Sequence, residues 1–249
     1  MSGISLFDYQ LDAVSRIRNG CILCGGVGSG KSRTSLAYYY KEQDGVLGTK
    51  NYVRMKNPKD LYIITTARKR DTLEWEGELS YFLLSTNPKV NGYKNRVIVD
   101  SWNNIQKYKN VTDSFFIFDE QRVVGSGVWV KSFLKITKSN DWILLSATPG
   151  DTWQDYIPVF IANGFYRNRT EFCNDHIIYS RFSKFPKIDR YINTGRLIRL
   201  RDRILVDMDF KRETVRHHED LYFEYNKELY REVGKTRFDP YKQEPIANA

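Results

Sequence analysis

The chain has 249 residues, of which 41% are hydrophobic and 28% charged, and its formal net charge is +9. This length suffices for one large core or two modest domains. The sequence has no apolar run long enough to span a bilayer and no signal peptide, so we expect a cytoplasmic protein without a membrane partner. Seven of the nine net positive charges fall within residues 1–150, which favours nucleic acid as a partner.

The alternation of apolar and mixed segments predicts an α/β fold, with a mostly parallel sheet flanked by helices on both faces. Strands are expected near residues 21–24, 61–66, 96–102, 114–119 and 142–147, and helices near 31–41, 68–84 and 127–138. The insert 45–60, rich in Gly, Asn and Lys, is expected to be a loop. Ligands of such folds bind at the C-terminal ends of the strands, which is where the motifs described next are found.

Residues 25–32 read Gly-Gly-Val-Gly-Ser-Gly-Lys-Ser and fit the P-loop pattern. An apolar strand precedes the loop and a helix follows it, so backbone N–H groups and the helix dipole can hold a triphosphate. We expect Lys31 to reach the β- and γ-phosphates of ATP and Ser32 to bind Mg²⁺. The residues predicted to hold ATP in this loop are Gly26, Gly28, Ser29, Gly30, Lys31 and Ser32.

Two cysteines on the strand before this loop, Cys21 and Cys24, have the Cys-x-x-Cys spacing of redox and zinc sites. Residues three apart on a strand point to opposite faces, so the two thiols are interpreted as packing residues. We predict neither zinc nor a disulfide.

An apolar strand over residues 111–120 ends in two carboxylates, Asp119 and Glu120. A solvated strand end is the plain interpretation, but the P-loop upstream favours a catalytic one. Asp119 is then the Mg²⁺ partner through water, and Glu120 polarises the attacking water as general base.

A further buried strand over residues 141–145 leads into Ser146-Ala147-Thr148-Pro149-Gly150. A Ser/Thr/Pro turn is one interpretation. The other is that the hydroxyls of Ser146 and Thr148, lying beside the Asp119 strand, sense the γ-phosphate and couple hydrolysis to movement.

Together these motifs resemble the first RecA-like domain of a superfamily-two helicase or translocase, because Ser-Ala-Thr after a DExx box is specific to that group. The resemblance implies an ATP hydrolase that uses ATP and Mg²⁺. It also implies that Phe7, Tyr9 and Gln10 read the adenine, the glutamine by hydrogen bonds and an aromatic ring by stacking. The resemblance also assigns Arg122 to the coupling between the DExx box and Ser146-Ala147-Thr148. Relatives often carry His or Asp at this position, and an arginine cannot act as the neutral or acidic bridge that those residues provide.

The same resemblance assigns nucleic-acid contacts to two further segments. One comprises Thr66, Ala67, Arg68 and Lys69, and the other Ser101 and Trp102. A solvated helix start is the alternative for the basic cluster, but cations at a helix N-terminus oppose its dipole. Contacts with phosphates do not distinguish DNA from RNA. We favour DNA over RNA as the nucleic acid that this protein binds.

Two details narrow the resemblance. Trp75 and Glu78 are similar to the Trp-x-x-Glu of Swi/Snf-type remodelling ATPases. The motif sequences Ser-Trp-Asn-Asn at 101–104 and Asp-Glu-Gln-Arg at 119–122 are most similar to those of short helicases of bacteriophages. This resemblance implies that the protein is located in the host cytoplasm.

The first domain is predicted over residues 1–150, and 151–249 is predicted to hold its end and a linker of helices and a strand. Residues 166–192 are expected to be mixed helix and loop. The basic helix 197–205, a strand and a Tyr-containing helix follow in the order of the Swi/Snf-type interdomain segment. No arginine motif of a second domain is found, so we expect a half-motor with low activity alone, completed by a second RecA-like domain in cis or in trans. The alternatives are another P-loop ATPase or kinase, and a non-enzymatic nucleic-acid-binding module.

Overall fold

The computed structural model describes residues 2–119, 123–182, 185–210, 219, 222 and 224–246. The chain divides into two compact units, Met1–Phe210 and Lys211–Ala249. Two residues predicted to be functional, Glu120 and Arg122, lie outside the described residues.

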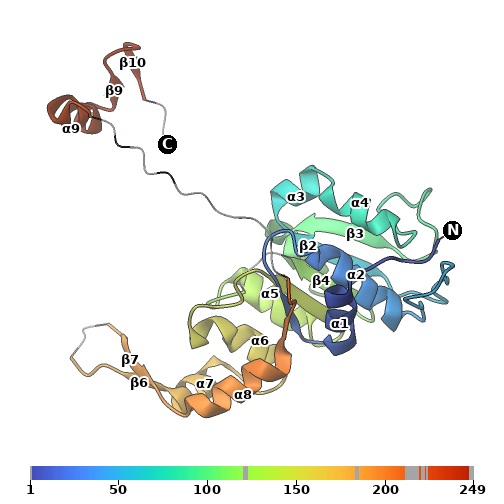
Figure 1. Ribbon diagram of the computed structural model, residues 1–249. Coiled ribbons are helices and arrows are strands. Elements are labelled where there is room, and N and C mark those ends of the chain that lie inside the picture. Colours follow the sequence, from blue (N-terminus) through green and yellow to red (C-terminus); the bar gives the residue numbers. More distant parts are fainter. Residues whose placement is uncertain are drawn as a thin grey trace. The chain divides into compact units, whose positions relative to one another are not determined.

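The first unit is built on a six-stranded sheet in the order β3-β2-β4-β5-β1-β8 (Figure 1). Every neighbouring pair in this sheet is parallel, which confirms the predicted α/β architecture. Its strands are β1 (Ile22–Cys24), β2 (Leu61–Thr65), β3 (Val97–Ser101), β4 (Phe115–Asp119), β5 (Asp141–Ser146) and β8 (Leu205–Asp207). All residues of β2 and β4 are buried, as expected for central strands covered on both faces.

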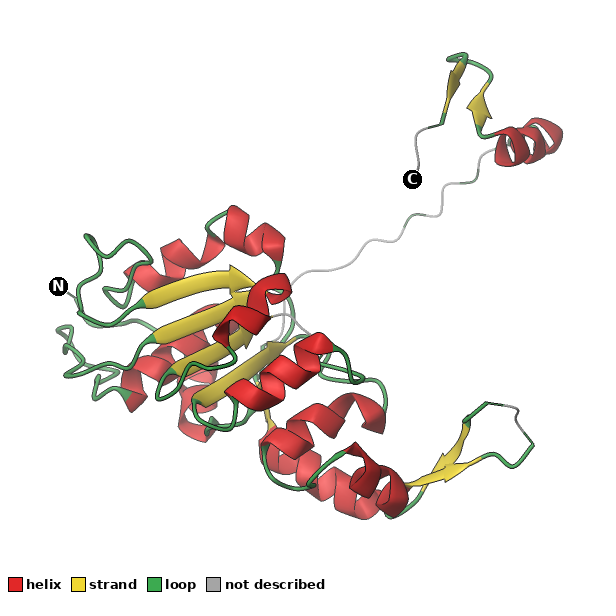
Figure 2. Cartoon of the chain, turned by 180° about the vertical axis from the view of Figure 1, so that it is seen from behind, coloured by secondary structure: helices red, strands yellow, loops and turns green. Residues whose placement is uncertain are grey.

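Helices cover both faces of the sheet (Figure 2). Phe115 and Ile117 of β4 pack with helices α1, α2 and α4, whereas Phe116 and Phe118 pack on the opposite face with α5 to α8. This is the alternation that a strand imposes. The helices are α1 (Asp8–Arg16), α2 (Lys31–Glu42), α3 (Ala67–Asp71), α4 (Glu74–Ser80), α5 (Val128–Ile136), α6 (Ile157–Ala162), α7 (Arg169–His176) and α8 (Thr194–Ile204), with 3-10 turns over Trp102–Tyr108 and Trp153–Tyr156.

The single helix predicted over 68–84 is wrong in one respect, because the structure has two short helices there. Leu73, at the break between α3 and α4, adopts a φ of 56° in the left-handed region. Such a backbone conformation cannot continue a right-handed helix. Trp75 and Glu78 therefore lie on α4 and Arg68 on α3.

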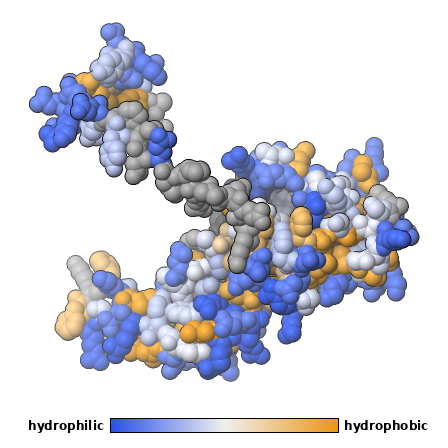
Figure 3. Space-filling view, in the orientation of Figure 1, coloured by the Kyte–Doolittle hydropathy of each residue, from blue (hydrophilic) through white to orange (hydrophobic). Residues whose placement is uncertain are grey.

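The segment 166–192 contains α7 and an antiparallel hairpin, β6 (Ile177–Tyr179) with β7 (Ile188–Tyr191), in place of the predicted helix and loop. These strands of three and four residues are too short for a clear alternation pattern. Phe182 and Phe185, beyond the strand ends, are exposed, and Figure 3 shows apolar residues gathered at this end of the hairpin.

The first unit extends to Phe210, so it includes a large part of the segment 151–249, which was predicted to hold the end of the first domain and a linker. Strand β8 pairs with β1 as the sixth strand, and Met208 N–H donates to the carbonyl of Cys24 at 2.8 Å. The predicted order of basic helix and strand is present as α8 and β8. Buried Leu197 and Leu200 anchor α8 to the core while its arginines face outward.

The second unit holds α9 (Lys227–Thr236) and an antiparallel pair of short strands, β9 (Phe238–Asp239) and β10 (Glu244–Pro245). The side chain of Asn226 caps α9 by accepting the N–H groups of Glu228 and Leu229. Among the described residues of the whole chain, no helix has the length and apolar character needed to cross a membrane.

Candidate functional site

The P-loop joins the C-terminal end of β1 to the start of α2. Gly28 and Gly30 have φ angles of 83° and 76°, in the left-handed region that only glycine adopts without strain. A Cβ atom on Gly30 would also lie 2.4 Å from Nε2 of Gln10. The loop conformation therefore depends on glycine at this position and on the neighbouring glutamine.

Lys31 is the first residue of α2, a helix of 12 residues. Its Nζ donates to the carbonyl of Gly25 at 2.7 Å and to that of Gly26 at 3.0 Å. The ammonium group is thus held over the loop itself. Positive charge, loop N–H groups and a helix N-terminus thus lie together, an arrangement that suits an anion such as a phosphate.

The predicted adenine-reading residues lie beside this loop. Gln10 as a residue is only 3% exposed. Its Oε1 atom accepts a hydrogen bond from the backbone N–H of Phe7 at 3.0 Å. Phe7 stacks on Tyr9 with ring centroids 5.6 Å apart and planes 8° from parallel, and the Tyr9 hydroxyl donates to the carbonyl of Ser29. Because Phe7 is 69% exposed, its ring offers an open face to a base.

A cavity of about 240 Å³ connects these aromatic residues to the P-loop. It is lined by Ser5, Leu6, Phe7, Tyr9, Gln10, Gly28, Gly30, Arg33 and Glu78. Sequence reasoning did not single out Arg33, which pairs with Glu78 at 2.8 Å and lies 3.8 Å above the ring of Tyr81. The Trp-x-x-Glu spacing pointed to Glu78, whereas nothing local marked its partner on α2.

Asp119 ends the central strand β4 and is 1% exposed. Its Oδ2 atom accepts hydrogen bonds from three side chains of the described residues: Thr65 Oγ1 at 2.8 Å, Lys69 Nζ at 3.2 Å and Trp75 Nε1 at 3.3 Å. A buried carboxylate needs such partners to remain charged. This network of β2, α3 and α4 around Asp119 was not predicted.

The first segment assigned to nucleic acid divides into two kinds of residue. Ala67 and Arg68 are exposed, as a contact surface requires. The side chain of Thr66 caps α3 by accepting the N–H of Lys69 at 3.3 Å. The ammonium of Lys69 is directed to Asp119, so its position links the contact segment to the phosphate site.

The side chains of Ser101 and Trp102, the second segment predicted to contact nucleic acid, are buried, with 2% and 3% of their surface exposed. Trp102 packs on Phe118 and donates its Nε1–H to the backbone carbonyl of Asp119 at 3.0 Å. A tryptophan with its N–H satisfied in the core contributes packing and orientation.

Asp100 organises the segment around these two residues. It accepts hydrogen bonds from Asn104 and Tyr108, each at 2.7 Å, from the N–H of Ser101, and from Arg70 at 3.3 Å. Burial alone raises the pKa of this carboxyl, but the hydrogen bonds outweigh burial and hold its pKa below the usual range.

Ser146 lies between the P-loop and Asp119. In the sheet, β5 stands between β4 and β1, with Leu145 opposite Asp119 and Ser146 opposite Cys24. The Oγ atom of Ser146 accepts the N–H of Thr148 at 3.1 Å. Thr148, two residues beyond the end of β5, is exposed.

These residues fit ATP and Mg²⁺. The position of a Cβ on Gly26 meets no atom within 4 Å, which leaves room above the loop for phosphates. Lys31 supplies the cation, while the Ser32 hydroxyl and the Asp119 carboxylate are hard oxygen donors of the kind Mg²⁺ prefers.

Comparison with known proteins places the fold. No protein-family model matches the chain, and no curated protein matches it. The *Sulfolobus solfataricus* SWI2/SNF2 ATPase core in complex with dsDNA is similar with a TM-score of 0.60 at 15% sequence identity, over 83% of this chain and 45% of that one. The ATPase core domain from the same organism gives 0.56 at 16% identity, over 83% and 44%.

The similarity shows that the chain has the RecA-like α/β fold that is also present in these two ATPase cores. It spans less than half the length of these two solved structures.

Proposed function

We propose that residues 1–210 form the first motor domain of an ATP-hydrolysing nucleic-acid translocase or helicase, with double-stranded DNA as its track. The supporting observation is that the P-loop, Ser146 and Asp119 stand on three neighbouring strands at one edge of the sheet. The similar *S. solfataricus* core was solved with dsDNA, which favours duplex DNA over RNA.

In this proposal the chain holds ATP from both ends. Phe7 and Gln10 take the base, while the loop amides and Lys31 take the phosphates. Ser32 and Asp119 hold Mg²⁺, which neutralises charge on the phosphates during transfer to water. Glu120 follows Asp119 directly, and we assign it the role of orienting and deprotonating that water.

Helix α3 is proposed to couple the track to the phosphate site. Arg68 is exposed for phosphate contact, and the neighbouring Lys69 bonds to Asp119. Because α3 has only five residues, a shift of Arg68 toward a DNA strand also moves Lys69. Binding of nucleic acid can then alter the position of the carboxylate that holds Mg²⁺.

A second RecA-like domain completes the proposed site. Motors of this fold use an arginine from the facing domain, and such a residue accelerates hydrolysis by about 10³–10⁵-fold. Residues 1–210 alone are therefore assigned weak ATP binding and slow turnover, with the second domain supplied in cis or in trans. The similarity of residues 101–104 to bacteriophage helicases remains a prediction.

The test is steady-state ATP hydrolysis with and without duplex DNA, single-stranded DNA and RNA, beside Lys31→Ala and Glu120→Gln variants. Stimulation by duplex DNA that both variants abolish supports the proposal. Transfer of the γ-phosphate to an added nucleotide would instead identify a kinase. DNA binding that is unaffected by ATP, with no turnover even when a second RecA-like domain is added, would identify a binding module.

A further inference from the structure

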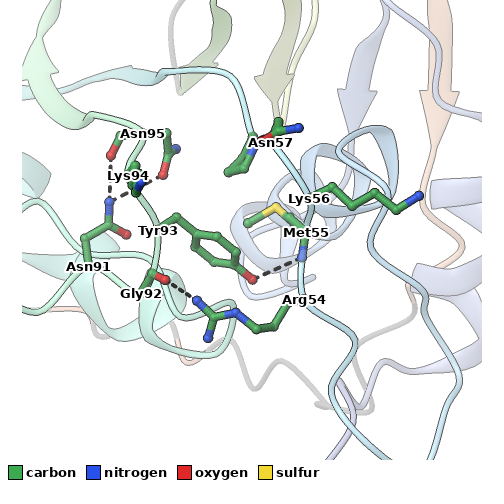
Figure 4. Close-up of a pocket in the computed structure, with 10 residues that line it drawn as sticks. Arg54, Met55, Lys56, Asn57, Asn91, Gly92, Tyr93, Lys94 and Asn95 are labelled. Atoms are coloured by element: carbon green, nitrogen blue, oxygen red, sulfur yellow. Dashed lines mark hydrogen bonds between the residues drawn. The ribbon is translucent and has the colours of Figure 1, made fainter.

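A second cavity lies away from the ATP site, between two loops that precede β2 and β3 (Figure 4). Its volume is about 790 Å³, larger than the cavity at the P-loop. One wall is formed by residues 54–58 and the facing wall by residues 91–95. Strands β1, β2, β3 and β4 run parallel, so these loops lie at the N-terminal ends of the strands, whereas the P-loop and Asp119 lie at the C-terminal ends. A strand of five residues separates the two ends by about 17 Å.

The lining of this cavity is basic. Among its ten residues are three cations, Arg54, Lys56 and Lys94, and no carboxylate. Within the described part of the chain, none of these cations forms an ion pair. The nearby Lys59 does form ion pairs, with Asp113 at 2.8 Å and with Asp141 at 3.0 Å. All three side chains are exposed, so water screens their mutual repulsion, and their positive charge is available to attract an anion into the cavity.

The walls are fastened to each other. Arg54 donates to the carbonyl of Gly92 and lies 4.9 Å from the ring centroid of Tyr93. The hydroxyl of Tyr93 accepts the N–H of Met55 at 3.3 Å and bonds to the hydroxyl of Tyr52 at 2.8 Å. Figure 4 shows the Arg54–Gly92 and Met55–Tyr93 hydrogen bonds crossing between the loops. The hollow is thus preformed, which lowers the entropic cost of binding a ligand.

Asn91 stabilises the facing wall of the cavity. Its Nδ2 donates to the carbonyl of Asn95 at 2.7 Å, which holds the two ends of this loop together. The Oδ1 atom of Asn91 is buried, so a ligand in the cavity does not reach it. The groups of the lining that can meet a ligand's charge are therefore the three cations.

Helix α2 connects this cavity to the P-loop. The helix begins at Lys31 and ends about 18 Å away. Near its far end, the Tyr39 hydroxyl donates to the carbonyl of Lys59 at 2.5 Å and accepts from Asn95 Nδ2 at 3.1 Å. The Tyr40 hydroxyl donates to the carbonyl of Val53. Both loops are therefore bonded to the helix that carries the phosphate-binding lysine.

We propose that this cavity is a second phosphate-binding site, which takes the phosphate of a nucleotide on the cations Arg54, Lys56 and Lys94. The source is either a free nucleotide or a nucleotide within a nucleic-acid strand. Occupancy of the site tightens the loops on Tyr39 and Tyr40 and thereby changes the affinity of the P-loop. Only this coupling rests on the proposed ATPase function.

The experiment measures binding of AMP and of a short single-stranded DNA by calorimetry in the Lys31→Ala protein, where the P-loop is disabled. We expect binding to persist there and to weaken at least about tenfold when Arg54, Lys56 and Lys94 are all changed to Gln, since three charge contacts are lost. The matched control changes three exposed lysines, Lys109, Lys131 and Lys138, to Gln and should leave affinity within about twofold.

Each outcome decides the matter. AMP binding that depends on the three cations identifies a free nucleotide, and such dependence for DNA alone identifies a strand. Equal weakening in both triple variants would show that only overall charge matters and overturn the site. Loss of all binding in Lys31→Ala would do so too. Thermal unfolding checks that each variant is folded, and Asn91→Asp, which adds one carboxylate to the cavity, should also weaken binding. These binding measurements need no ATP hydrolysis. Their result therefore tests the second site separately from the proposed ATPase function.

Discussion

Lys69 Nζ lies 3.2 Å from Asp119 Oδ2, and this pair ties helix α3 to the end of the central strand β4. Lys69 is next to exposed Arg68, while Asp119 is the carboxylate proposed to hold Mg²⁺. The pair is therefore a direct physical link between the surface proposed to meet nucleic acid and the phosphate site.

Replacing Lys69 by Met keeps much of the side-chain volume and removes the charge beside Asp119. Because Asp119 is buried, losing one charged donor should lower the free energy of unfolding by about 1–3 kcal/mol, as measured by urea denaturation. Stimulation of ATP hydrolysis by duplex DNA should also fall. The comparison is Arg68→Gln, which should weaken DNA binding with little change in stability. Equal stability of Lys69→Met and the unaltered protein would argue against the link.

The left-handed conformation of Gly30 predicts a specific sensitivity of the P-loop. Gly30→Ala should lower the free energy of unfolding by about 1–2 kcal/mol, because the conformation itself is strained for alanine and the Cβ meets Gln10. Gly26→Ala is the matched substitution in the same loop, since its Cβ meets nothing within 4 Å. Thermal unfolding that shows the two variants to be equally stable would contradict the loop geometry.

Asp100 predicts a dependence of stability on pH. Its pKa is held below the usual range in the folded protein, so its contribution is fully present above the pKa of the unfolded chain. The contribution is lost as pH falls through the folded-state pKa. Asp100→Asn should thus be less stable by about 1–3 kcal/mol at neutral pH, and the difference should shrink in acid. Denaturation at several pH values checks this, with the exposed Asp44→Asn as control; a difference that grows in acid would refute it.

The exposed ring of Phe7 predicts a loss confined to ATP affinity. Base stacking on an aromatic ring contributes about 1–3 kcal/mol, so Phe7→Ala should weaken ATP binding roughly 5- to 150-fold. Phe182→Ala removes an even more exposed ring far along the chain and should leave ATP affinity unchanged. Fluorescent-nucleotide titration of both variants gives the answer, and an unaltered affinity in Phe7→Ala would exclude stacking there.

The parallel sheet and the elements at its ligand-binding edge could be predicted because they follow from local pattern. The run before Gly25 and the run ending at Asp119 are apolar segments bounded by motif residues, and that is enough to place a strand. Cys24 and Ser146, predicted on different strands, are paired in the sheet.

The features of the fold and of the candidate site that could not be predicted depend mostly on contacts between residues distant in sequence. Lys69 and Trp75 meet Asp119 only because β2 pairs with β4. The burial of Trp102 follows from packing on Phe118, which no local pattern reveals. A strand after the basic helix was predicted only from the resemblance, and its pairing with β1 as the sixth strand of the sheet follows from no local pattern. The left-handed turn at Leu73 has no glycine to indicate it.

We propose that Lys31 and Asp119 belong to one Mg²⁺-dependent ATP site. The affinity for ATP, measured with and without Mg²⁺ in the unaltered chain and in Lys31→Ala and Asp119→Asn, decides this. We expect Mg²⁺ to tighten ATP binding to the unaltered chain, Asp119→Asn to remove this effect, and Lys31→Ala to weaken binding at least about 10²-fold. Binding that is equally tight in all three proteins and indifferent to Mg²⁺ would contradict it.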